Sequence, residues 1–302
     1  MTSLPDPVMA KPRYRRPAVL PVLLLNRRWG EKSLAALLVS LLSGLVVAWQ
    51  YDVAAPYYST VFMEVVLPFG SFWRSLHFYS SQLFFLGLIL HLLATLLDPA
   101  AVAMPPWRWG LLIATLPVVV LLLFTGYVLR GDATGESAGA IAENLALAVP
   151  FLGPGLNDLL FAISTAGLKR LYANHVIGLL LGWLFLSWDH VRRYRLAWER
   201  QGSVLAPLFL FCMVVPAPLE PAGTGVFHIG GPWFFLGLQE LLRYLPPFWA
   251  GVVFPAILPL ALLGLPRRDS GAAGRWRRPA GLVTVAWLLL YTGLTVAALL
   301  RG

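Results

Sequence analysis

Long apolar runs constrain this chain more than any other feature of its sequence. They occupy roughly residues 33–50, 71–97, 109–129, 168–191, 203–218, 247–265 and 281–300. A helix of about 20 apolar residues crosses a bilayer, and all of these runs except 203–218 are long enough to do so. Charged residues make up 12% of the chain, half of the roughly 25% that is typical of soluble proteins. The sequence therefore predicts an all-α, polytopic membrane helix bundle.

The positions of the basic residues predict how the chain crosses the membrane. The net charge is +9, and the Lys and Arg residues form short clusters before the first run, after the fourth run and at 267–278. Cytoplasmic loops carry an excess of such residues, so we expect a cytoplasmic N-terminus. The 267–278 loop is cytoplasmic only if 203–218 also crosses, which favours about seven transmembrane helices. Clusters of this kind between apolar runs argue against a nucleic-acid partner.

The cysteine content and the N-terminal segment exclude other classes of protein. The only cysteine, Cys212, lies inside an apolar run. One thiol excludes an internal disulfide, a Cys-rich iron–sulfur site and a CxxCH haem attachment. Residues 1–28 form a basic tail without the early apolar core of a signal peptide, so we expect this tail to be retained in the cytoplasm.

Four of the five histidines lie inside candidate membrane helices. His77 and His91 are 14 residues apart, and His175 and His190 are 15 apart. At about 100° per residue, each pair lies roughly on one face of its helix, with about 21–22 Å between its members. Ionisable residues at membrane depth are usually functional, and facing helices of a bundle often hold a cofactor.

If the two helices face each other, the four imidazoles form two pairs. His77 then pairs with His175 near the outer face, and His91 pairs with His190 near the cytoplasmic face. Each pair could ligate one haem iron from both sides, which predicts two stacked haems. A single histidine would more simply be a packing residue, but two matched pairs favour ligands. His228, in an outer loop, is expected to be a polar loop residue.

At this point the sequence resembles the cytochrome b family of bc and b6f complexes. The segments that carry the resemblance are FGSFWRSLH followed by LILH, FTGYVL, VPFLGPGL, and LKRLYANH followed by WDH. The region from PWFFLGLQELLR onward looks like the small companion subunit of b6f, subunit IV. The resemblance implies a four-helix dihaem domain at 29–200 and a three-helix C-terminal domain at 201–302. The second domain would contain an outer quinol-site loop at 219–246.

The resemblance also implies roles for individual residues. It makes His77 and His175 the ligands of the outer b haem, and His91 and His190 those of the inner b haem. The other residues that it assigns to cofactors are Arg74 and Arg170 near haem propionates, Gly30, Gly44 and Gly126 against the macrocycles, and Arg195 near the inner quinone. The alternative roles are membrane anchoring or cytoplasmic charge for the arginines, and helix packing for the glycines.

The chain departs from the family at three points. Leu112 stands where the third helix of the family has a glycine 14 residues before Gly126. The quinol-oxidising motif P-E-W-Y reads Gly231-Pro232-Trp233-Phe234, so its glutamate is absent; Glu240 could replace it as a base or could face lipid or a partner. We expect Pro232, Trp233 and Glu240 at the quinol site. The cysteine of the extra covalent haem in b6 would fall near Arg28, so no such haem is expected.

The resemblance implies a b-type dihaem cytochrome in a bacterial-type inner membrane. It would be the core subunit of a quinol:cytochrome c-type oxidoreductase, a bc-type respiratory complex. The partners expected are quinone, membrane lipid, a second copy of the complex in a homodimer, and a Rieske iron–sulfur protein, a c-type cytochrome (multihaem ones included), or both. Two alternatives remain open. One is a non-bifurcating conduit from quinol to an outer multihaem cytochrome or reductase, and the other is a haem-free transporter or scaffold.

Overall fold

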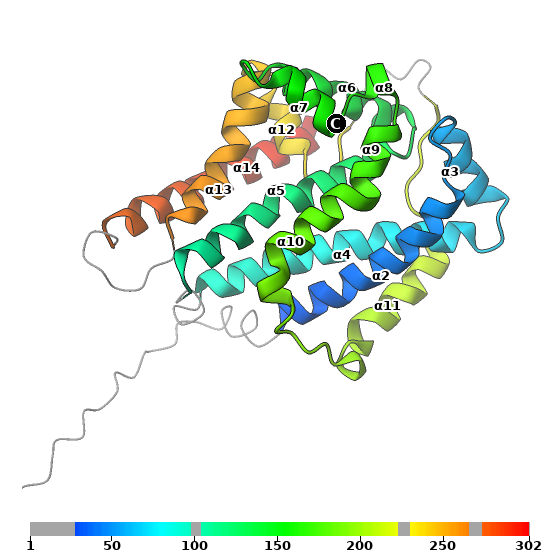
Figure 1. The fold of residues 1–302 in the computed structure, drawn as a ribbon, viewed down its shortest axis with the longest axis horizontal. Helices are drawn as coiled ribbons and strands as arrows, with labels where there is room; N and C mark the ends of the chain where they lie inside the picture. Colours follow the sequence, from blue (N-terminus) through cyan, green and yellow to red (C-terminus); the bar gives the residue numbers. More distant parts are fainter. Residues whose placement is uncertain (1–27, 98–103, 223–229, 266–273, 302) are drawn as a thin grey trace, which may run out of the picture.

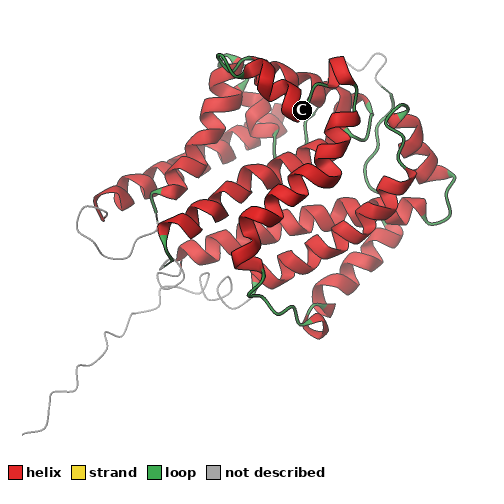
Figure 2. Ribbon diagram, viewed as in Figure 1, coloured by secondary structure: helices red, strands yellow, loops and turns green. Residues whose placement is uncertain are grey.

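The computed structural model describes residues 28–97, 104–222, 230–265 and 274–301, and every regular element in them is helical (Figure 2). The expected tail at 1–28 lies almost wholly outside the described residues, as do His228 and most of the 267–278 loop. The longer helices are α2 (Trp29–Gln50), α4 (Gly70–Leu97), α5 (Pro106–Val128), α10 (Leu179–Val191), α11 (Gly202–Val214), α13 (Phe254–Leu263) and α14 (Gly274–Arg301). The shorter elements are α3 (Pro56–Val65), α6 (Ala133–Leu147), α7 (Gly153–Leu160), α8 (Ile163–Ala166), α9 (Lys169–Ala173), η1 (Asn174–Gly178), η2 (Trp198–Arg200), α12 (Leu236–Leu241) and η3 (Trp249–Val253).

The longer helices run along one common direction in Figure 1. Among the described residues, five segments are long and apolar enough to cross a membrane: α2, α4, α5, α14 from Arg278, and the segment from α9 to α10. Two more, α11 and the segment from η3 to α13, are apolar but shorter. The 247–265 run thus forms a shorter helix than its apolar length suggested. Five long and two short segments agree with the prediction of about seven.

The short helices mark one end of the bundle. Figure 1 shows α3, α6, α7 and α12 at the end where α4 begins, whereas α4, α10 and α13 finish at the opposite end. The side chains of Asp189 and Arg108, at that opposite end, lie 3.1 Å apart (Oδ2 to Nε). We call the two ends the outer and inner ends, following the expected topology.

The outward-facing surfaces of these helices are apolar. Phe185 of α10, Leu210 of α11 and Leu289 of α14 are 80%, 66% and 69% exposed. Exposed apolar faces on helices of this length require a bilayer, because water would penalise each of them. The prediction of an all-helical integral membrane bundle is confirmed.

The centre of the bundle is formed by α2, α4, α5 and α10. Its buried residues are Ala36, Leu37, Phe84, Val119, Leu123 and Trp183. The small side chains of α2 let it lie close to α4, where Gly87 faces the backbone of Ser33 and the Ser33 hydroxyl donates to the Phe84 carbonyl at 2.9 Å. These contacts fix the relative rotation of α2 and α4, and with it the directions of the histidines on α4.

The remaining helices pack on opposite sides of this core. Leu208 and Cys212 of α11 pack against Val39 and Leu76 of α2 and α4. On the other side α12, α13 and α14 pack together, and Leu262 of α13 packs against Trp109 of α5. The resemblance assigned α11 to a C-terminal domain at 201–302 together with α12–α14. In the structure α11 instead packs on the core, apart from α12–α14.

Residues 215–222, which we call the strap, follow α11 across the outer end. Side chains bond the backbone at four of its eight positions. Tyr79 donates to the Pro216 carbonyl, the Ala217 amide donates to Ser75, Arg74 donates to the carbonyls of Ala217 and Pro218, Arg130 donates to the Pro218 carbonyl, and the Glu220 amide donates to Asp132. An extended segment has no internal backbone partners, so these bonds satisfy its polar groups. The strap is thereby held on α4 and α6.

Candidate functional site

The outer end of the core contains the first histidine pair. His77 comes from α4 and His175 from η1, and their ring centroids lie 6.1 Å apart. Imidazole nitrogen binds a metal at about 2 Å, so two facing rings at this separation leave room for one metal ion between them. His77 and His175 are each partly buried by protein atoms.

The helix that carries His175 is not a regular α-helix. Residues Asn174–Gly178 form a π-turn between α9 and α10. A π-turn contains about one residue more than an α-turn, so it takes up the extra residue that makes the His175–His190 spacing 15 and the His77–His91 spacing 14. The two helices therefore present their histidines in nearly the same register.

Hydrogen bonds orient both rings of the outer pair. His77 Nδ1 lies 2.9 Å from the Ser40 carbonyl oxygen, and His175 Nδ1 lies 3.0 Å from Thr125 Oγ1. A metal-bound histidine commonly uses one ring nitrogen in this way and keeps the other for the metal. Ser40 and Thr125 were not identified from the sequence. The only sequence feature that could have identified them is their position beside the predicted glycines. Thr125 adjoins Gly126, and Ser40 precedes Gly44 by one helical turn.

The inner end of the core contains the second pair. The rings of His91 on α4 and His190 on α10 lie 5.9 Å apart. The ring of Tyr194 lies 5.2 Å from that of His190. Burial, and then the nearby Glu31 carboxylate, raise the pKa of Tyr194, so its hydroxyl keeps its proton at neutral pH.

Three glycines stand against the histidines. A Cβ added to Gly44 would lie 2.8 Å from His77 Cε1, and one added to Gly126 would lie 2.9 Å from His175 Cε1. At Gly30 the added atom would lie 3.2 Å from His91 Cε1. A side chain at Gly44 or Gly126 would displace a ring, and one at Gly30 would require its neighbours to shift by a few tenths of an ångström. Close approach of the backbone at these positions is what a cradle for a flat macrocycle requires.

His190, the remaining member of the two pairs, lies beside a leucine, Leu112, and beside no glycine of the described residues. A cavity between α5 and α10 is lined by His190 and by Leu112, together with Met104, Arg108, Leu111, Leu186, Asp189 and Arg193. Gly110 does not face this cavity, because its nearest neighbour is Leu263 of α13 at 3.9 Å.

The predicted arginines have distinct surroundings. Arg74 is buried near the outer pair, and its Nε donates to Glu64 Oε2 at 2.6 Å. Its other nitrogens donate to the strap. Arg170 is half-exposed and paired with Asp158 of α7, whereas Arg195 is exposed at the inner end. The structure thus brings only Arg74 into the core.

The side chains of Trp233 and Glu240, two of the three residues predicted for the quinol site, have different partners. Trp233 donates to Gln82 Oε1 of α4 at 2.9 Å, and Pro232 precedes it in the same turn. Glu240 is 2% exposed on α12, where it accepts from Arg301 at 2.5 Å and Tyr244 at 2.8 Å and lies 3.4 Å from Arg243. The Glu240 carboxylate is therefore engaged in ion pairs between α12 and α14.

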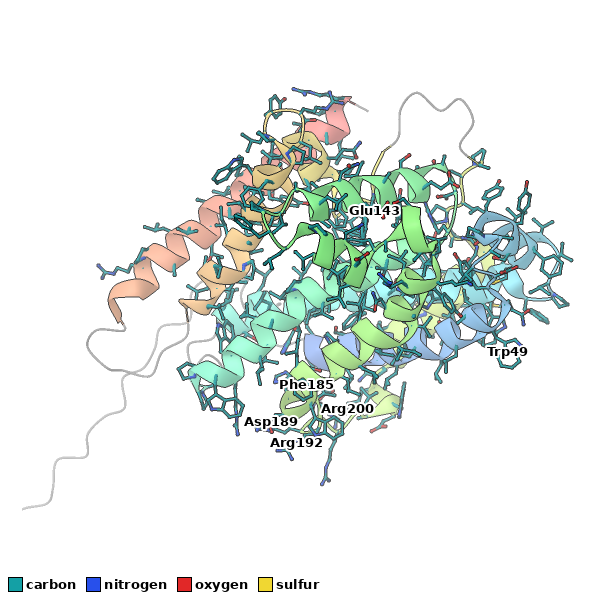
Figure 3. All side chains as sticks on the ribbon, turned by 45° about the horizontal axis from the view of Figure 1, so that its top comes forward. Trp49, Glu143, Phe185, Asp189, Arg192 and Arg200 are labelled. Carbon is teal, nitrogen blue, oxygen red and sulfur yellow. The ribbon has the colours of Figure 1, made fainter. Side chains whose placement is uncertain are left out.

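The inner end also has a cluster of arginines around Asp189. Arg192, Arg193 and Arg108 approach its carboxylate at 2.6, 2.5 and 3.1 Å. Figure 3 shows Asp189 and Arg192 at the end of the bundle opposite Glu143 of α6. Three guanidinium groups on one carboxylate give this end an excess of positive charge, as expected for a cytoplasmic face.

A family model decides the classification of this helical core. The model described as cytochrome b/b6/petB matches residues 20–192, which is more than half of the chain and contains all four paired histidines. The chain belongs to the cytochrome b family. Membership implies that it binds b-type haem.

Relatives agree with this classification over different lengths. Cytochrome b of Bugula neritina is 26% identical over 275 residues, which cover 78% of this chain and 74% of the relative. The menaquinol:cytochrome c reductase cytochrome b subunit of Geobacillus thermodenitrificans is 27% identical over 164 residues, covering 51% of this chain and 73% of the relative.

The fold of this cytochrome b resembles that of a solved relative. A chain of a hyperthermophilic respiratory Complex III superposes with a TM-score of 0.63 at 19% identity, over 94% of this chain and 93% of that chain. The likeness extends beyond residue 192 and so includes the α11–α14 region.

The residues of the two pairs fit a b haem. Each pair offers two facing imidazoles in an apolar bundle, and glycines face three of the four rings. Neutral imidazole is an established axial ligand of haem iron. Arg74, a buried cation three residues before His77, suits a carboxylate such as a propionate, although Glu64 occupies its Nε.

Proposed function

We propose that this cytochrome b binds two haems and passes electrons between quinone sites near the two faces of the membrane. The observation that carries the proposal is the pair of histidines at each end of the core, 6.1 and 5.9 Å apart. The membership of the family supports haem b, and the histidine pairs support two copies. We further propose a cytoplasmic N-terminus and a bacterial-type inner membrane, in line with the positive-inside rule.

Bound haem would supply one-electron chemistry, and the chain would supply ligands, orientation and an apolar enclosure. His77 and His175 would hold the outer haem, with their rings oriented by Ser40 and Thr125. His91 and His190 would hold the inner haem. Gly30, Gly44 and Gly126 would leave space for the macrocycles.

The outer quinol site is proposed beside the 232–235 turn. Trp233 packs on Phe85 of α4 at 5.8 Å, and Phe235 packs on Phe124 of α5 at 5.1 Å. Aromatic side chains of this kind suit a flat quinol ring. The printed name of the Geobacillus relative, menaquinol:cytochrome c reductase, supports quinol as the donor and a c-type cytochrome as an acceptor. A Rieske protein and a homodimer of complexes follow from the same proposal.

The test is a dithionite-reduced minus oxidised spectrum of the purified full chain, with haem quantified per polypeptide. Two b haems per chain are expected. One haem would contradict the two-site proposal, and none after an adequate haem supply would favour a transporter or scaffold.

Gly44→Val is expected to abolish the outer haem selectively. The new side chain would meet His77, whose ring already lies 2.8 Å from the position of an added Cβ. Haem per chain should then fall from two towards one. Gly293→Val on α14, which has open space around it, is the control and should keep both haems. An unchanged haem content in Gly44→Val would show that this glycine is not part of a haem cradle.

A second candidate function is a non-bifurcating conduit from quinol to an outer multihaem cytochrome or reductase. It is favoured by Pro232, which stands at the position of the motif glutamate, and by the engagement of Glu240 with Arg301. A conduit would deliver both quinol electrons to one acceptor. Counting electrons that reach the inner haem per quinol oxidised, with the outer acceptor present, separates the two functions.

Glu240→Gln is expected to lower stability and leave quinol oxidation per haem unchanged. The substitution removes the charge that Arg301 and Arg243 face, at a cost of about 1–3 kcal/mol because both arginines are half-exposed. The measurement is thermal unfolding alongside quinol turnover, with the exposed Glu199→Gln as control. Unchanged unfolding with a loss of turnover of about 100-fold or more would instead make Glu240 the base.

A further inference from the structure

The inner histidine pair is more crowded than the outer one. At the outer pair each ring faces a glycine, His77 facing Gly44 and His175 facing Gly126. At the inner pair only His91 faces a glycine, Gly30. Tyr194 also occupies that side, because its hydroxyl lies 3.0 Å from the position of a Cβ on Gly30.

The chain's own regularity identifies Leu112 as the exception. On α2, Gly30 and Gly44 are 14 residues apart and face the inner and outer histidines of α4. On α5, Gly126 faces the outer histidine of the other helix, and the residue 14 positions earlier is Leu112. Leu112 lines the same cavity as His190. Gly110 faces Leu263, so it does not provide a glycine opposite His190.

The inner rings are also less firmly held. At the outer pair, Ser40 and Thr125 bond the Nδ1 atoms of both histidines. For His91 and His190, the described residues include no partner that bonds a ring nitrogen. The outer site is therefore better prepared for a ligand before it binds.

We infer that Leu112, with Tyr194, makes the inner site the weaker of the two haem sites, so that haem fills the outer site first. The inference rests on the proposed dihaem function. A macrocycle at His190 must displace the Leu112 side chain, and crowding of this size in a packed interior lowers affinity by roughly tenfold or more. Leu112 thus determines the difference in haem affinity between the two sites.

The experiment measures how haem distributes between the two sites in the full chain. Protein is purified from cells given a graded haem supply, and both total haem per chain and the spectra of the two haems are recorded. Spectra of His77→Ala and His91→Ala identify the outer and inner haem. In the unsubstituted chain, the outer haem should reach half occupancy at roughly one tenth of the haem supply that half-fills the inner site.

Leu112→Ala and Leu112→Gly form a graded series on this background. Each should shift inner-site filling to a lower haem supply, by up to about tenfold for glycine. Leu116→Gly is the matched control, because it lies on the same helix with the same loss of helix propensity but packs towards α13. Equal filling of the two sites in the unsubstituted chain would overturn the inference, as would identical behaviour of Leu112→Gly and Leu116→Gly. If the unsubstituted chain bound no more than one haem at saturating supply, the dihaem proposal itself would fail instead.

Discussion

His91→Ala purified with saturating haem is expected to contain one haem per chain, and its remaining haem should have the spectrum of the outer site. The alanine removes one of the two imidazoles, 5.9 Å apart, that would hold the inner haem. The outer pair lies at the other end of the core with its own hydrogen bonds to Ser40 and Thr125. Since the two sites share no ligand, loss of one should leave the other intact.

Two further variants make this result decisive. His190→Ala should reproduce it, because both residues belong to one site. His77→Ala should give the opposite spectrum, with the inner haem retained. Two haems in His91→Ala would contradict the ligand assignment. A loss of both haems with normal thermal unfolding would contradict the independence of the two sites.

Asp132→Ala is expected to cause the largest loss of stability of any single substitution considered. Asp132 is fully buried and caps α6 by accepting from the Gly135 amide at 2.9 Å. It also lies 3.0 Å from the Arg130 guanidinium and accepts from the Glu220 amide of the strap at 3.1 Å. The substitution leaves a buried guanidinium without its counter-charge, which costs about 3–5 kcal/mol.

Thermal unfolding in detergent, followed by circular dichroism, measures this effect. The control is Asp158→Ala, since the Asp158 side chain is 72% exposed and its loss should cost no more than about 0.5 kcal/mol. Limited proteolysis should also cut Asp132→Ala within residues 215–222 before any other part of the core. Equal unfolding temperatures for the two variants would show that the strap and the α6 cap contribute little to stability.

The histidine pairs were within reach of the sequence because helical periodicity is a local property. Spacings of 14 and 15 residues placed His77 with His91 and His175 with His190 on helix faces, and the apolar runs predicted the bundle. The glycines, by contrast, gained meaning only through the family resemblance, since a glycine in a membrane helix has several uses.

Contacts between distant segments could not be read from the same patterns. The π-turn at Asn174–Gly178 depends on packing around the helix and leaves no periodic trace. The bond from Thr125 to His175 joins residues 50 positions apart. Glu240 looked available as a base on its own helix, and its pairing with Arg301 depends on how α14 docks beside α12. Such pairings are set by tertiary structure, which a single sequence does not specify.

The contacts of the strap determine at which residue this chain could be split into two separately encoded polypeptides that still assemble. Because α11 packs on α4 and residues 215–222 are bonded to α4 and α6, a first polypeptide ending at residue 222 would keep all of these contacts within one molecule. A second polypeptide carrying α12–α14 would then dock through the face of α5 that contains Trp109. A division at residue 200 would instead require α11 and the strap to find their partners on a separate chain. Co-expressed halves split after residue 222 should therefore assemble more completely than halves split after residue 200.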